Sequence, residues 1–597
     1  MAEYMAPLQD MNFVLKSVAK IDEINQLPGF EEATPDLVEA VLEEAAKFAT
    51  DVLSPLNTVG DTVGAKHEGD EVTTPPGWKE AYQMFSESGW SGLAGAPEFG
   101  GQGLPKTLAT AVDEMWNGAN MAFAVGAMLT TGAVHAIEHH AADELKATYI
   151  PQMLSGEWTG TMNLTEPQAG SDLSQVRTKA VPEGDHYLIS GQKIFITYGE
   201  HDLAENIIHL VLARTPDAPA GTRGISLFIV PKFLVNDDGS LGARNDLRCA
   251  SIEHKLGIHG SPTAVMSYGD NDGAIGYLVG EENKGLMYMF TMMNAARHAV
   301  GLEGVALSER AYQQALEYAR DRVQGKPLGS EEESATIIDH PDVRRMLMEM
   351  KAKTEAMRAL AYVCAAAYDK GSNENDPERK AYANRRGDFL TPIVKGWCTE
   401  IGNEVTSLGV QIHGGMGYIE ETGAAQHFRD ARITTIYEGT TGIQAGDLVG
   451  RKTIRDGGTG AREVMDEMLA VANDAAASDN ASVRLVGEKL GAAITTVEKV
   501  VAWIIETERT DPRMPAAASV RYLMMWGTFC GAWQLAASAL AAYAELNADA
   551  SANATFLNAK IATAAFYVHH VLPQVDAMAA VIMEGSEAVF AIDKAAL

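Results

Sequence analysis

Apolar residues follow two different spacings along the chain, and the change between them indicates its organisation. Up to about residue 158 they recur at helical spacing, as in residues 36–47, with turns rich in glycine such as residues 99–105 between the runs. This part of the chain is therefore predicted to be helical.

Between about residues 159 and 280 the apolar residues alternate or form short runs, which predicts β-strands. Residues 206–213 and 224–231 each form one predicted strand, and residues 187–197 form two strands around a Ser-Gly turn at Ser190. Because no helical segment separates these strands, a Rossmann sheet is disfavoured.

Helical spacing returns near Glu282, where apolar residues three, four or seven apart predict a long helix to Val323. After further helices, a glycine-rich linker at residues 455–460 precedes a last segment rich in Ala and Met. The predicted fold class is α+β: an N-terminal helical domain, a middle β-domain, a C-terminal helical bundle and an extra C-terminal helical domain. The predicted boundaries place these domains at residues 1–158, 159–280, 281–454 and 455–597.

Charge and cysteine usage narrow the class of protein. The 597 residues carry a formal net charge of −33, which repels nucleic acid and anionic membranes because phosphate binding needs clustered Lys and Arg. The four cysteines are far apart and form no CxxC pair, as in proteins of a reducing cytosol. The N-terminus lacks a signal-peptide pattern and no run of 18 apolar residues occurs, so we expect a cytoplasmic protein without a membrane span.

Several common chemical motifs are absent. No GxGxxG turn, GxxxxGK[ST] phosphate loop, GxSxG elbow or HExxH motif occurs. His135, His139 and His140 share one predicted helix but lack carboxylate partners at ligand spacing. We therefore expect no metal site.

Two segments of the β-rich region have a composition suited to ligand binding. Residues 162–172 follow a strand and offer hydroxyl groups and free backbone N–H groups, which suit the polar edge of a heterocycle, although a plain Ser-rich turn has the same composition. Phe195 and Thr197 end a predicted strand and are expected on one face, where one side chain can stack and the other can hydrogen-bond. A core Phe on an edge strand remains the alternative.

Two helical segments carry further candidates. Arg297 and Arg322 lie 25 residues apart on the long predicted helix and share a face, so one could bind a substrate and the other a phosphate, unless both are merely solvated.

Residues 411–418 are rich in glycine, which permits close approach of a ligand to the backbone. Glu438 lies between Tyr437 and Gly439, ahead of a capping box from Thr441 to Gln444, and is either a structural or a catalytic carboxylate.

In order and spacing these segments resemble the acyl-CoA dehydrogenase family of flavoenzymes. The resemblance covers about residues 30–450, and its motifs are Thr-Glu-Pro-x-Ala-Gly-Ser-Asp from Thr165 and Tyr-Glu-Gly-Thr from Tyr437. It implies an FAD cofactor held between an N-terminal helical domain, a β-domain and a four-helix domain. The segment 455–597 and the opening residues from Tyr4 resemble a longer bacterial subgroup that includes 3-methylmercaptopropionyl-CoA dehydrogenases.

The resemblance assigns residues to FAD and to the substrate. The expected FAD contacts are Met162, Leu164, Thr165, Phe195, Thr197, Arg322, Gln411, Gly415 and Thr440, and the expected substrate contacts are Ser171, Arg297, Tyr437 and Gly439. Phe195 stands where the family usually has Trp, which keeps an aromatic face and loses an N–H group. Gly442 stands where relatives have Gln, so a cofactor contact at that position is not carried over.

Glu438 is the base that the resemblance implies. Some relatives place the base directly before the arginine that matches Arg297, but Ala296 occupies that position here and cannot accept a proton. The expected reaction is α,β-dehydrogenation of an acyl-CoA, short-chain or 3-methylthiopropanoyl, to the 2-enoyl-CoA. Burial would raise the pKa of Glu438 and strengthen it as the base.

The resemblance also implies partners and leaves alternatives. Electrons would pass to an electron-transfer flavoprotein, and FAD contacts across subunits imply a homodimer or a dimer of dimers. The alternatives are an acyl-CoA oxidase that uses oxygen and a flavin-bearing DNA-associated stress protein, which would require a basic patch.

Overall fold

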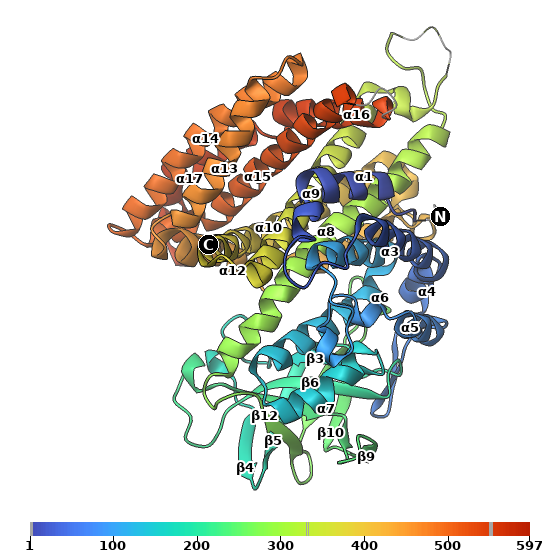
Figure 1. The fold of residues 1–597 in the computed structure, drawn as a ribbon, viewed down its shortest axis with the longest axis vertical. Helices are drawn as coiled ribbons and strands as arrows, with labels where there is room; N and C mark the ends of the chain where they lie inside the picture. The colour runs from blue at the N-terminus through green and yellow to red at the C-terminus, as the bar shows by residue number, and fades with distance from the viewer. Residues whose placement is uncertain (1–3, 330, 332–333, 549–552, 597) are drawn as a thin grey trace. The chain divides into compact units, whose positions relative to one another are not determined.

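The computed structural model describes residues 4–329, 331, 334–548 and 553–596, which divide into two compact units (Figure 1). The sheet unit comprises Ala45–Leu104 and Met115–Ala296, and the helical unit comprises the segments up to Glu44, Pro105–Glu114 and from Arg297 onward. The predicted α+β class is confirmed. The predicted domain boundaries stay a prediction.

An eight-stranded sheet forms the centre of the sheet unit, with the order β10-β11-β5-β12-β7-β6-β3 and β4 also paired with β5. Its strands are β3 (Trp158–Asn163), β4 (Lys179–Glu183), β5 (His186–Thr197), β6 (Asn206–Ala213), β7 (Ser226–Pro231), β10 (Leu247–Ile252), β11 (Thr263–Tyr268) and β12 (Ala274–Leu278). Two short pairs, β1 (Lys66–Glu68) with β2 (Glu71–Thr73) and β8 (Phe233–Val235) with β9 (Leu241–Arg244), complete its strands. Among the strands in the described part of the chain, β3 and β6 form the only parallel strand pair of this sheet, so it is not of the Rossmann type.

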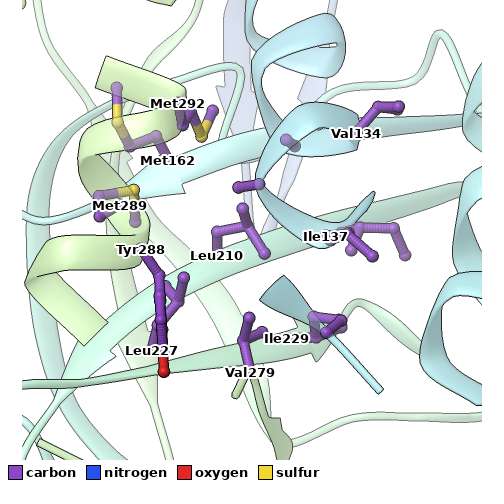
Figure 2. Close-up of a cluster of buried hydrophobic side chains, with 14 of the residues drawn as sticks. Val134, Ile137, Met162, Leu210, Leu227, Ile229, Val279, Tyr288, Met289 and Met292 are labelled. Atoms are coloured by element: carbon purple, nitrogen blue, oxygen red, sulfur yellow. The ribbon is translucent and has the colours of Figure 1, made fainter. Parts of the chain in front are cut away.

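Both faces of the central strands are buried, which explains their near-continuous apolar sequences. Leu210 and Ile229 lie in one apolar cluster, whereas their chain neighbours Val211 and Val230 lie in a second cluster. Figure 2 shows the first cluster, in which Val134 and Met289 come from helices beside the strands. A strand buried on both faces cannot alternate between apolar and polar residues.

The predicted turn at Ser190 is wrong, because residues 186–197 form the single strand β5. The first part of β5 pairs with β12, and the part from Gly191 onward pairs with β11. Gly191 has φ 149°, and a Cβ there would lie 2.9 Å from the Thr178 backbone. The glycine therefore permits a close approach of the neighbouring chain rather than a chain reversal.

Helices complete the sheet unit. They are α4 (Ser54–Val63), α5 (Trp78–Glu87), the part of α6 (Lys106–His140) from Met115, α7 (Asp143–Leu154) and the start of α8 (Gly285–Asp321). Among the described residues, α6 alone is long and apolar enough to cross a membrane by length and composition, but 72% of its most apolar window is buried inside the protein. Asn120 interrupts α6 at φ −159°, and its side chain accepts a hydrogen bond from the Phe123 N–H, so it starts the next helical segment.

The helical unit is built from α1 (Leu8–Phe13), α2 (Ile21–Ile24), most of α3 (Pro35–Phe48), the start of α6, the rest of α8, α9 (Pro341–Asn373), α10 (Pro377–His413), α11 (Ala424–Ala431), α12 (Thr441–Val449), α13 (Thr459–Ala476), α14 (Ala481–Glu508), α15 (Arg513–Ala548), α16 (Ala554–His570) and α17 (Gln574–Gly585). The long predicted helix corresponds to α8, which ends one residue before Arg322. The two predicted arginines therefore do not both lie on this helix.

The last helices share a core with the preceding bundle. Helix α15 packs against α9, α10 and α12 as well as against α14, α16 and α17 (Figure 1). A Cβ at Gly527 of α15 would lie 1.9 Å from the ring of Trp397 on α10, so only glycine allows this approach. The segment after residue 455 is therefore integrated into the helical unit.

A buried group of charges joins sequence-distant parts of the helical unit. The Arg358 guanidinium, 1% exposed, donates to Asp10 of α1, Glu114 of α6 and Glu309 of α8, with N–O distances of 2.7 Å to each carboxylate. Lys560 of α16 donates to the second oxygen of Asp10 at 2.6 Å. We call these five residues the Arg358 cluster.

Candidate active site

Glu438 lies in a left-handed turn directly before α12. Its φ is +53°, which is unfavourable for a residue with a side chain, and Gly439 follows at φ +90°. The Gln444 side-chain amide donates to the carbonyl oxygens of both residues, at 3.4 and 3.2 Å. A Cβ at Gly439 would lie 2.7 Å from this amide, so the turn requires glycine there.

The predicted cap of the following helix is displaced by one residue. The N-cap is Thr440, whose side-chain oxygen accepts from the Ile443 N–H, rather than Thr441. Gln444 therefore reaches the turn instead of closing a capping box. The result is a strained turn fixed at both ends, and the half-buried Glu438 projects from it.

Burial raises the pKa of Glu438 to about 7, against the opposing effects of the Lys395 and Arg297 cations. Near neutral pH both the acid and the base form of this carboxyl group are therefore populated. A group poised near the working pH is suited to general-base catalysis.

Beside Glu438 lies a buried group of polar side chains from α8 and α10. The Tyr437 hydroxyl donates to Glu303 of α8, which is 1% exposed, and the Nζ of Lys395 of α10 donates to the Thr434 carbonyl at 2.8 Å. Burial raises the pKa of Glu303 to about 8 and lowers the pKa of Lys395 to about 8. Near neutral pH Glu303 is therefore mostly uncharged while Lys395 keeps its charge.

Arg297, a predicted substrate contact, is 4% exposed and pairs with Asp447 of α12 at 3.5 Å. Arg451 also donates to Asp447, so this carboxylate lies between two cations. Ala296, at the alternative base position, is buried and apolar. Tyr437, Glu438, Gly439, Thr440 and Arg297 thus belong to one neighbourhood of the helical unit, since Arg297 acts electrostatically on Glu438.

The predicted loop of the sheet unit is fixed by a buried ion pair. Glu166, 3% exposed, accepts from Lys193 Nζ at 2.8 Å and from the Thr178 hydroxyl at 2.6 Å. Although burial would raise the pKa of Glu166, Lys193 and the surrounding donors hold it below its usual value. Lys193 also donates to the Leu164 carbonyl at 3.0 Å, and the Ile194 N–H donates to the Thr165 carbonyl at 2.9 Å. The loop therefore lies against β5, close to Phe195.

The other predicted residues of this loop differ in exposure. Ser171 is exposed, and Thr165 is half-buried. The Met162 side chain is buried in the apolar cluster of Figure 2, so only its main chain is left for a ligand.

Phe195 is 59% exposed and has a left-handed backbone with φ +59°. The pairing of β5 with β11 shifts register between Ala264 and Met266, which places a β-bulge at this point of β5. Side chains do not alternate regularly between the two faces of a strand at a bulge. The alternation that predicted Phe195 and Thr197 on one face therefore does not hold at this position. Strain that presents a large apolar ring to solvent is typical of binding sites.

Arg322, Gln411 and Gly415 lie near the C-terminal ends of α8 and α10, and all are exposed. The rings of Tyr318 and His413 stack at 4.5 Å and join these two helix ends. A Cβ at Gly415 would meet no atom within 4 Å, so packing within the chain does not demand glycine there. Close approach by a ligand would demand it.

Sequence reasoning missed Lys395 and Glu303, and it assigned Gln444 to a capping box rather than to the Glu438 turn. A signal existed for the first two, because each is a charged residue within an apolar helical run. Their partners lie far away in the sequence, so the network itself needs the tertiary structure.

Comparisons with known proteins match successive parts of the chain to domains of one kind of protein. Family models described as acyl-CoA dehydrogenase N-terminal, middle and C-terminal domains match residues 36–157, 161–270 and 283–453, and one described as acetyl-CoA dehydrogenase C-terminal like matches residues 464–593. A 3-methylmercaptopropionyl-CoA dehydrogenase of Ruegeria pomeroyi is 50% identical over 96% of this chain and 97% of that protein.

Solved structures extend the likeness. Butyryl-CoA dehydrogenase from Megasphaera elsdenii has a TM-score of 0.56 at 26% identity and covers 70% of this chain and 98% of that chain. An acyl-CoA dehydrogenase from Bacillus anthracis, solved in complex with FAD, has a TM-score of 0.72 at 19% identity and covers 95% of this chain and 92% of that chain. At 19% identity, the likeness to the Bacillus anthracis protein shows a shared fold only.

Proposed function

The chain belongs to the acyl-CoA dehydrogenase family, and we propose that Glu438 is the base with which it desaturates an acyl-CoA at the α,β bond. The observation that carries this proposal is the strained turn that presents a half-buried carboxyl group with a pKa near 7. The resemblance in the sequence to this family is confirmed, and the protein is an oxidoreductase.

FAD is the cofactor of this family, and the residues present suit it. We propose that the exposed ring of Phe195, the loop at Leu164 and Thr165, and Thr197 meet the flavin. Arg322, Gln411, Gly415 and Thr440 would hold the rest of the cofactor. The exposed helix ends at Arg322, Gln411 and Gly415 would contact FAD across an interface with a neighbouring subunit. Bound FAD supplies the acceptor for a hydride from Cβ of the substrate.

The residues of the chain supply the remaining chemistry. Glu438, ionised, takes the proton from Cα, and burial makes it a stronger base than a carboxylate in water. The left-handed turn fixes its backbone, and we propose that backbone groups beside Gly439 and the side chains of Ser171, Arg297 and Tyr437 position the thioester.

The proposed substrate is based on a relative, and the proposed partners are based on the resemblance in the sequence. We propose a short-chain or 3-methylthiopropanoyl thioester as substrate, because the Ruegeria protein acts on that thioether compound and is 50% identical. We further propose a cytoplasmic homodimer or dimer of dimers that passes electrons to an electron-transfer flavoprotein.

Anaerobic titration of the holoenzyme with acyl-CoAs tests this function. We expect the flavin to bleach fastest with 3-methylthiopropanoyl-CoA or a short straight chain and slowest with long chains. Fastest bleaching by a long-chain thioester would contradict the substrate. Peroxide release in air without an added electron carrier would instead favour an oxidase.

A second expected result concerns Phe195. Replacement by Gly removes the ring but relieves about 1–2 kcal/mol of left-handed strain, so we expect the free energy of unfolding to change little. FAD binding should weaken by about tenfold, the scale of one aromatic stacking contact. Fluorescence titration of the apoprotein with FAD measures this, and unchanged affinity would remove Phe195 from the cofactor site.

A further inference from the structure

Lys395 is a fully buried cation on α10 that the proposed chemistry leaves unassigned. Its Nζ donates at 2.8 Å to the carbonyl of Thr434, in the segment that leads into the Glu438 turn. A buried ammonium group is unfavourable unless it is paired, and an apolar side chain would fill this part of α10 at lower cost. Its presence in the core beside the turn therefore points to a role at the turn.

The other charged groups around Glu438 interact mainly with partners of their own. Arg297 on α8 pairs with Asp447 of α12, which Arg451 also contacts, so much of its charge is neutralised. Glu303 on α8 is the carboxyl group that acts most strongly on Lys395, but it accepts a hydrogen bond from Tyr437, and burial raises its pKa to about 8, so it is mostly protonated near neutral pH. The other titratable groups that act on this network are Glu400 on α10, Tyr368 on α9 and Asp430 on α11. Of the two cations that act on Glu438, Arg297 is held in an ion pair with Asp447, which leaves Lys395 as the cation that favours the ionised carboxylate.

We propose that Lys395 is a positioning residue whose buried charge, anchored on the Thr434 carbonyl, keeps Glu438 ionised for proton abstraction. The inference rests on the proposed function, because it assumes that Glu438 is the base. Without this cation, burial of Glu438 would be opposed mainly by the paired Arg297. The acid form would then persist to higher pH, where it cannot accept a proton.

Two variants distinguish the effect of the Lys395 charge from the effect of its hydrogen bond to Thr434. Lys395→Gln removes the charge and keeps an N–H donor for Thr434, whereas Lys395→Arg keeps a charge. The matched control is Lys353→Met, a buried lysine of α9 that pairs with Glu349 and Glu404. The measurement is the stopped-flow rate of flavin bleaching by 3-methylthiopropanoyl-CoA in each holoenzyme, between about pH 6 and about pH 9.

In the wild type we expect the rate to rise with pH through a midpoint near 7, as Glu438 ionises. Lys395→Gln should move this midpoint upward by about one pH unit or more, which lowers the rate at about pH 6 by roughly tenfold. Lys395→Arg should return the midpoint toward the wild-type value, and Lys353→Met should leave it in place. If Lys395→Gln fails to bind FAD, the shift is sought in Lys395→Met.

A uniform loss of rate at every pH in the Lys395 variants would show a structural anchor only and overturn the inference. An unmoved midpoint in Lys395→Gln would do the same. Glu438→Gln distinguishes these results from failure of the proposed function. If that variant still turns over with the same rise near pH 7, Glu438 is not the base and both proposals fall.

Discussion

Replacing Glu438 by Gln is expected to leave a yellow, FAD-containing protein whose flavin is reduced at least about 10²-fold more slowly by acyl-CoA, the scale of general-base loss. Gln is isosteric with the protonated acid, so it should fit the same left-handed turn and keep the contacts of Gln444 to the backbone. It has no basic lone pair for the α-proton. Stopped-flow bleaching under anaerobic conditions measures the loss.

Glu438→Gln should also change the pH dependence of thermal stability. Burial raises the pKa of Glu438 to about 7, above its ordinary value near 4.5, so ionisation between these values destabilises the folded wild type as pH rises. Glu438→Gln escapes this penalty and should gain thermal stability relative to the wild type at about pH 8 but not at about pH 4. The exposed Glu421→Gln is the control for both measurements. Near-normal reduction by Glu438→Gln would place the base elsewhere.

Local patterns in the sequence predicted the architecture because each depends on neighbouring residues. The long helix predicted from Glu282 to Val323 is α8, Gly285–Asp321, because apolar spacing reports a buried helix face directly. The strands predicted at 206–213 and 224–231 are β6 and β7 (Ser226–Pro231), and they follow from continuous runs of β-branched and apolar residues. Glu438 was identified by its position in a motif.

Other features depend on contacts that no local pattern contains. The Ser-Gly pair in β5 resembles a turn, but the strand continues because two different partners pair with its two halves. The bulge that exposes Phe195 arises from the register with β11. Thr440 and Thr441 are equivalent as caps in the sequence, and the backbone of the Glu438 turn selects the first.

The second large effect concerns stability and the Arg358 cluster. Arg358→Met keeps much of the apolar stem but leaves Asp10, Glu114 and Glu309 without their shared cation in a buried site. Removing one partner of a buried ion pair destabilises a protein by about 3–5 kcal/mol. Since the cluster joins α1, α6, α8, α9 and α16, we expect the helical unit to unfold at a clearly lower denaturant concentration.

Arg513→Met is the matched control for Arg358→Met, because Arg513 also meets a carboxylate at 2.7 Å but is 66% exposed. We expect its loss to change the free energy of unfolding by less than about 1 kcal/mol, since water screens the pair. The deficit of Arg358→Met should shrink toward about pH 5, where protonation of the abandoned carboxylates removes their unpaired charge. If both replacements lowered the free energy of unfolding equally in urea, the buried cluster would stabilise the protein no more than an exposed ion pair does. In that case the approach of α15 to Trp397 and the apolar core would hold these helices together on their own.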